Sequence, residues 1–164
     1  NSKSVFIVDS DGGNTENQKR KVIDEICEFD KDLKKDDFSN KIVLTQYCML
    51  ECYTFEKDLL KHAMLDETLN AKKEEFINTN TEAINKCLED RKQKKLDDLD
   101  VVSLSLDDKF EYIRKYGFTK KLIKAFRRAV GGSGFKRIEE LNKEELELYC
   151  DSLIQDLKSA FNIT

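Results

Sequence analysis

Apolar side chains recur every three or four residues through most of the chain, a spacing that predicts helices with one buried face. We expect successive helices over about residues 15–33, 39–64 (with a possible restart at Thr54), 68–77, 81–88, 105–116, 119–130 and 142–161. Together they predict an all-α bundle of about six to eight helices.

The helix ends have to be read from caps and glycines, because the chain contains no proline. Capping-box spacing occurs at Thr15/Gln18, Ser105/Asp108 and Asn142/Glu145, and Thr119 is a further candidate N-cap. We expect Gly117 to end one helix in a left-handed conformation and Gly131–Gly132 to end the next. The polar stretch 78–81 predicts a break between two helices.

Residues 1–13 are expected to form an extended tail, with a short strand or packed arm over 4–8, and the sequence Asp9-Ser10-Asp11-Gly12 follows it. An Asp-x-Asp loop of this kind occurs in phosphatases, but there it needs a parallel sheet, and we predict no further strands. A calcium loop starting at Asp9 would need Gly and Glu where Asn14 and Arg20 stand. We therefore interpret the loop as an exposed turn.

The composition fits a modest core beneath a heavily charged surface, with 39% hydrophobic and 38% charged residues. Residues 14–164 are expected to form one domain, with a possible division into two lobes near 96–105. No apolar run is long enough to cross a membrane, and no signal peptide is retained. The start at Asn1 fits a processed mature chain, or a chain shortened at its N-terminus.

The five cysteines allow two interpretations. They could be buried thiols of a cytosolic protein, or two disulfides and one odd cysteine in a secreted, extracellular protein whose core needs bracing, which we favour. Cys48 and Cys52 share one helix face, so each is expected to reach a different neighbouring segment, with Cys27 and Cys87 as the natural recipients. Cys150 completes the set of disulfide candidates.

The order Cys27…Cys48-x-x-x-Cys52…Cys87 resembles the first four cysteines of the insect odorant-binding proteins and their salivary relatives, the D7 proteins. The resemblance covers about residues 27–87, and the family's fifth and sixth cysteines have no counterpart here. It implies a secreted, disulfide-stapled helical protein of saliva with an apolar ligand cavity.

Nothing in the sequence points to catalysis. The one histidine, His62, has no partner residues that mark a catalytic dyad, and the glycines at 131–134 lack the Lys-Ser/Thr of a phosphate-binding loop. The cysteines and His62 also lack the spacing of a zinc site. We therefore expect a protein that is not an enzyme and holds no cofactor or metal.

The strongest charge feature lies between Arg114 and Arg137, where nine basic side chains occur with no acidic one. The net charge of the chain is −4, so the remainder carries −13. Within 119–130 the basic residues and the apolar residues follow the same helical spacing two positions apart, which predicts one cationic and one apolar face. The candidate polyanion-binding residues are Lys120, Lys121, Lys124, Arg127, Arg128, Lys136 and Arg137.

These observations lead to a secreted binding protein that engages an anionic partner, a sulfated glycosaminoglycan or an acidic protein, through this basic helix, with nucleic acid possible but not favoured. A solvated face paired with neighbouring acids and a membrane-surface helix are competing interpretations of the same stretch. The alternative function is a carrier of a small apolar or amine ligand in an inter-helical cavity lined by Phe55, Met64 and Phe76. An interaction module without a small ligand is a third class.

Overall fold

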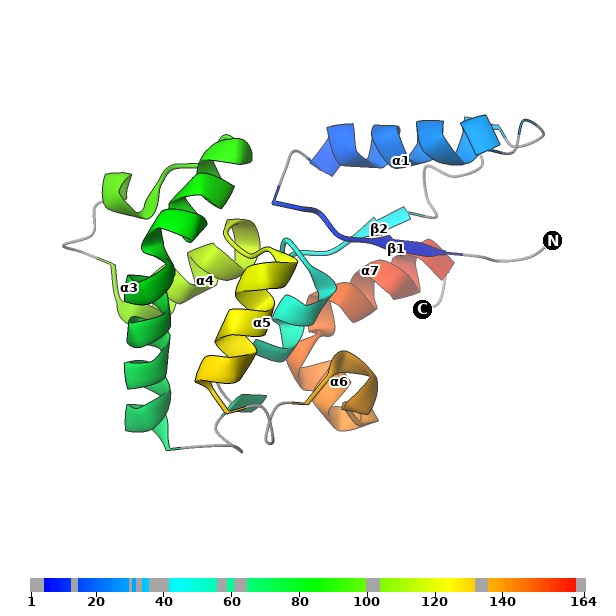
Figure 1. Ribbon diagram of the computed structural model, residues 1–164. Coiled ribbons are helices and arrows are strands. Elements are labelled where there is room, and N and C mark those ends of the chain that lie inside the picture. The colour runs from blue at the N-terminus through cyan, green and yellow to red at the C-terminus, as the bar shows by residue number, and fades with distance from the viewer. Residues whose placement is uncertain are drawn as a thin grey trace.

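A computed structural model shows a mostly helical protein with a short two-stranded sheet, which confirms the predicted all-α class (Figure 1). It describes residues 5–12, 15–29, 31, 34–35, 42–55, 59–60, 65–99, 104–131 and 136–161. The described helices and strands are β1 (Phe6–Val8), α1 (Thr15–Phe29), β2 (Ile42–Leu44), η2 (Leu50–Phe55), α3 (Asp66–Asp90), η3 (Leu96–Asp98), α4 (Leu106–Tyr116), α5 (Lys120–Ala129), η5 (Ile138–Glu140), α6 (Lys143–Tyr149) and α7 (Asp151–Phe161). The expected lobe division near 96–105 falls partly on residues outside this set.

The two strands are parallel, and α1 lies between them in the sequence, so the first part of the chain forms a β-α-β unit. Phe6 pairs with Ile42 and Val8 with Leu44. Figure 1 shows α1 and α7 on opposite sides of the strand pair, and both contact β2. The second strand was expected to be helical; its run Ile42–Leu44 is buried throughout, which is typical of a parallel strand covered on both faces.

The helix α3 runs without interruption where the sequence predicted two helices. The polar side chains at the expected break satisfy carbonyls of the preceding turn, with Asn80 donating to the Phe76 carbonyl and Thr81 to the Ile77 carbonyl. These residues therefore hydrogen-bond within the helix and do not cap a new one. After Asn142 the sequence predicted a single helix. The structure has two, α6 and α7, which meet at the buried Cys150.

The predicted caps at Ser105, Thr119 and Asn142 are confirmed. Ser105 with Asp108 and Asn142 with Glu145 form capping boxes, and the Thr119 hydroxyl accepts from the Leu122 amide. Gly131 follows α5 with φ +76°. Gly117 differs from the prediction, because its φ is −106°; its lack of a side chain serves packing, since an added Cβ would lie 3.2 Å from Ile84 Cγ2.

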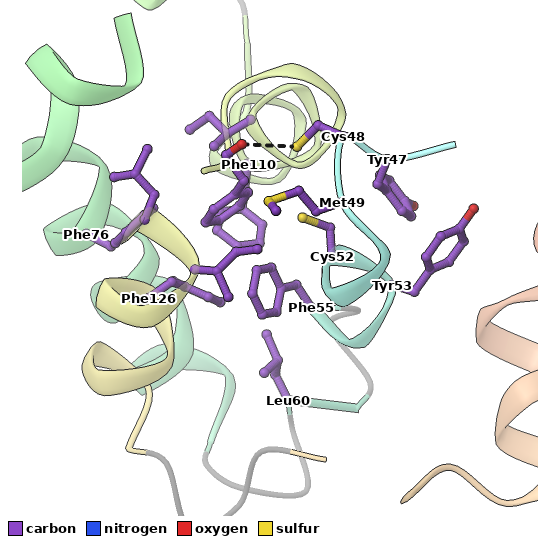
Figure 2. Packing of buried hydrophobic residues seen from close by; sticks show 14 of the residues in the cluster. Tyr47, Cys48, Met49, Cys52, Tyr53, Phe55, Leu60, Phe76, Phe110 and Phe126 are labelled. Atoms are coloured by element: carbon purple, nitrogen blue, oxygen red, sulfur yellow. Dashed lines mark hydrogen bonds between the residues drawn. The ribbon is translucent and has the colours of Figure 1, made fainter. Parts of the chain in front are cut away.

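An aromatic cluster forms the centre of the core where α3, α4, α5 and η2 meet (Figure 2). Its members are Phe55, Phe76, Phe110, Phe118 and Phe126, with the centroids of contacting rings 4.8–6.1 Å apart. Each of these rings is at most 2% exposed. Within the described residues, no helix combines the length and apolar character needed to cross a bilayer.

The expected disulfide bonds are absent. All five cysteines lie in the described part of the chain, and each carries a reduced thiol. The prediction assumed that Cys48 and Cys52 lie on a regular helix and point to two neighbours. The chain between them instead bends and enters the short helix η2, and the Cys48 thiol donates to the Arg114 carbonyl at 3.2 Å.

Replacing Phe126 by alanine should lower the free energy of unfolding by about 3–5 kcal/mol, because the ring is fully buried against four others. The matched control is Phe29→Ala, since the Phe29 side chain is 96% exposed on α1. Urea titration of both variants measures the difference. Equal losses of stability in the two variants would contradict the packing described here.

Candidate polyanion-binding site

The helix α5 is held so that its basic face points outward. Leu122, Ile123 and Phe126 are buried on one side and contribute to the aromatic core. The ten residues of the helix include five basic and no acidic side chains. Lys120, Lys121, Lys124 and Arg128 are exposed, and Arg127 is half-buried. The apolar face fixes the helix orientation, so the cations have to face solvent.

None of the four exposed cations of α5 forms an ion pair with another residue in the described part of the chain. Among the described residues, no carboxylate therefore lies within ion-pair distance of these four side chains. We call Lys120, Lys121, Lys124 and Arg128 the basic face. Side chains of like charge gathered on one helix raise the local potential and attract anions.

Two further predicted site residues lie outside this face. Lys136 forms an ion pair with Glu145, and Arg137 pairs with Glu139 at 3.2 Å and Glu140 at 3.0 Å. Their charges are already balanced by neighbouring carboxylates. The predicted set of seven therefore separates into the helix residues and a locally neutralised pair beyond Gly131.

Arg114, at the start of the acid-free stretch, has a structural role. Its side chain is buried, its Nε donates to the Cys52 carbonyl at 3.0 Å, and its guanidinium lies 4.0 Å from the centre of the Tyr47 ring. An ion pair of 2.8 Å with Glu111 balances its charge. The basic residue next to it, Lys115, is also within 3.6 Å of Glu111.

The loop Asp9–Gly12 lies at the carboxyl end of β1, beside the corresponding end of β2. Our expectation that the chain has no second strand was wrong, so one objection to phosphate chemistry at this loop no longer holds. Ser10 is buried; its amide donates to Thr45 Oγ1 at 3.0 Å and its hydroxyl to the Tyr47 carbonyl at 2.8 Å. Ligands of open α/β sheets bind at this edge of the strands.

The carboxylate of Asp9 connects this loop to α5. Burial raises its pKa, and the 2.7 Å hydrogen bond from the Leu50 amide acts against the rise. The negative charges of Glu51 and Asp11 raise the pKa further, whereas the positive charge of Lys120 lowers it. Lys120, the first residue of α5, therefore acts on Asp9 through its charge. Among the described residues, no group of three or more His, Cys, Asp or Glu side chains is placed to hold a metal ion.

Arg91, at the end of α3, is a residue that our sequence analysis did not single out. Its Nη1 donates to the carbonyls of Tyr116 and Phe118 at 2.7 and 2.9 Å. Its Nη2 lies 3.8 Å from Asp11 Oδ1. It thereby holds the turn before α5 against the loop after β1. The only signal in the sequence was the charged run that follows α3, which has no distinguishing spacing.

Two of the three residues predicted to line the alternative ligand cavity, Phe55 and Phe76, belong to the aromatic cluster. Phe55 and Phe76 both pack against the rings of Phe118 and Phe126, which fill the space between them. Met64 and the single histidine, His62, lie outside the described residues. A separate pocket of about 180 Å³ lies between α3 and α4, lined by Glu74, Ile77, Asn78, Leu106 and Lys109.

No protein-family model, no curated protein and no solved structure matches the chain. The resemblance to odorant-binding and D7 proteins thus rests on cysteine spacing alone.

Replacing Asp9 by asparagine should leave the protein equally stable or more stable at neutral pH. The pKa of Asp9 is raised on folding, so the ionised carboxylate lowers the stability of the wild-type protein at pH values above that pKa. The substitution removes this cost at neutral pH. Its stabilising effect should fade as the pH falls, because the wild-type carboxyl then becomes protonated. An amide oxygen can still accept from Leu50. Urea titrations of the variant and the wild type from neutral to acidic pH measure the difference in stability. A variant that is less stable than the wild type, by an amount that grows toward neutral pH, would contradict the prediction.

Proposed function

We propose that this protein binds a polyanion through the basic face of α5. The observation that carries the proposal is that Lys120, Lys121, Lys124 and Arg128 are exposed together with no ion pair in the described chain. Many cations elsewhere in the described chain lie beside carboxylates, as Lys73 does beside Asp107 and Lys136 beside Glu145. A face of exposed cations that form no ion pair within the described residues supports a role in recognition of negative charge.

The chemistry of this face fits a repeating anion better than a single small one. Each exposed ion pair contributes little by itself, so useful affinity requires several contacts at once. A chain of sulfate or phosphate groups supplies them along the length of a helix. Such binding releases counterions and weakens steeply as salt is added.

The cysteine pattern predicts a secreted, salivary protein, and no disulfide bond in the structure supports that prediction. Sulfated glycosaminoglycan, acidic protein and nucleic acid each carry such repeated anionic groups. Binding assays with heparin, poly-glutamate and a duplex DNA of equal length distinguish them.

The double variant Lys120→Glu, Lys124→Glu should leave a heparin column at clearly lower salt than the wild type, because it reverses two charges of the basic face. The matched control is Lys143→Glu, Lys158→Glu, which makes the same change of charge at exposed positions on α6 and α7. Elution salt is the measurement, and circular dichroism checks that both variants are folded. If both variants shift equally, net charge explains retention and the basic face does not.

Hydrolysis of a phosphate ester at the Asp9–Asp11 loop is a second candidate function. The favouring observation is the parallel pairing of β1 and β2, which places an Asp-x-Asp sequence at the carboxyl ends of the strands. Lys120 of the basic face is close enough to lower the pKa of Asp9, so a bound phosphate would meet cations and carboxylates together. In such a hydrolysis a water oxygen attacks the phosphorus and passes a proton to a carboxylate of the loop. The ester P–O bond breaks, and the ester oxygen leaves, after protonation, as an alcohol.

An assay of p-nitrophenyl phosphate and a labelled oligonucleotide, each with and without magnesium, tests this second function. The variant Asp11→Asn should abolish any hydrolysis, whereas Asp156→Asn, a matched change at an exposed position on α7, should not. Hydrolysis that survives Asp11→Asn, or none by the wild-type protein on either substrate, would exclude the second function without affecting the first.

A further inference from the structure

The pocket between α3 and α4 is formed by two helix faces that meet. The helices pack against each other (Figure 1), and the five residues that line the pocket all come from them. Glu74, Ile77 and Asn78 are three and four positions apart on α3, so they share one face of that helix. Leu106 and Lys109 are three positions apart on α4 and share a face in the same way. The pocket is therefore separate from the basic face of α5.

A partly buried ion pair fixes the two helices beside this pocket. Lys73 of α3 is 3% exposed, and its Nζ lies 2.9 Å from Asp107 Oδ1 of α4. The same ammonium group lies 4.9 Å from the centre of the Phe110 ring, which belongs to the aromatic cluster. Lys73 and Asp107 are each adjacent in the chain to a residue that lines the pocket. These contacts hold α3 against α4, so the pocket is formed before any ligand binds.

The lining combines a carboxylate, an ammonium group and an amide with two aliphatic side chains. Neither Glu74 nor Lys109 forms an ion pair within the described residues, and the two do not pair with each other across the pocket. Both charges are thus available to a ligand. Ile77 is buried and Leu106 is half-buried, so together they supply an apolar surface. The Asn78 side chain can both donate and accept a hydrogen bond.

The volume of the pocket limits the ligand to a small molecule. A cavity of about 150 Å³ holds benzene, whereas pockets for drug-sized ligands exceed about 300 Å³. A volume of about 180 Å³ therefore accommodates a branched aliphatic group and the atoms next to it. Glu74 and Asn78 are exposed, so they lie at the rim, where the polar groups of such a ligand reach them.

We propose that this pocket binds a free aliphatic amino acid such as leucine. The ammonium group of the ligand pairs with the Glu74 carboxylate, and its carboxylate pairs with the Lys109 ammonium group and accepts from the Asn78 amide. The aliphatic side chain lies against Ile77 and Leu106. A zwitterion fits this lining because it matches both unpaired charges at once. A simple amine or a simple acid matches only one of them.

Titration of the full, isotope-labelled protein with L-leucine, followed through its amide chemical shifts by NMR, tests the proposal. Saturable shifts should appear at the amides of residues 74–78 and 106–109, while those of α5 stay unchanged. Isocaproate lacks the amino group of leucine and isoamylamine lacks its carboxylate, so each should bind several-fold more weakly. The proposal is overturned if leucine gives no saturable shift at these amides, or if either analogue binds as tightly as leucine.

Two variants test the charged side chains of the pocket. Glu74→Gln and Lys109→Met should each weaken leucine binding by about fivefold, because each removes one partly exposed ion pair with the ligand. The matched controls Glu82→Gln and Lys86→Met change exposed residues of α3 that do not line the pocket, and they should bind leucine as the wild type does. Wild-type affinity in either pocket variant would also overturn the proposal.

The comparison of leucine with its two analogues uses the wild-type protein, so it decides the proposal even if a variant does not fold. Heparin retention depends on the basic face of α5 and not on this pocket. The two functions can therefore fail independently of each other.

Discussion

The contacts of the Arg91 guanidinium join the β-α-β unit to the helices that follow it in the chain. The side chain leaves the end of α3, hydrogen-bonds to the Tyr116 and Phe118 carbonyls, and lies beside Asp11 in the loop after β1. It thereby satisfies carbonyls at the end of α4, which the helix itself cannot pair. The β-α-β unit is placed against the helices at this point, supported by the backbone bond from the Cys48 amide to the Arg114 carbonyl.

The aromatic cluster explains why the cations of α5 gather on one side. Phe126 is central among the rings and Leu122 and Ile123 are buried beside it, so α5 cannot rotate without exposing the core. Its basic residues occupy the opposite face for this reason. Lys136 and Arg137, which lie beyond the helix, are under no such constraint and pair with nearby glutamates. Packing, and not charge, therefore decides which cations stay available for a partner.

The carboxylate of Asp9 and the thiol of Cys48 are both groups whose charged forms burial disfavours. The Leu50 amide and the charge of Lys120 partly offset the effect of burial on the pKa of Asp9. At Cys48 the interaction with Cys52 and the charge of Arg91 outweigh burial, so the pKa of this thiol is lowered. Groups of this kind are found more often at functional positions than elsewhere on a protein. Both lie within the region where the strand ends, the end of α3 and the start of α5 meet.

The sequence alone determined the helical class, the caps at Ser105, Thr119 and Asn142, and the two-faced character of α5. These properties depend on residues a few positions apart, so they can be read from spacing. Only the tertiary structure decided that Ile42–Leu44 is a strand, because a short apolar run takes its conformation from the partner it pairs with. The same holds for Arg91 and the thiols, whose contacts join residues up to 70 positions apart. Burial, pairing and neutralisation of charge are properties of such distant contacts, and no local pattern specifies them.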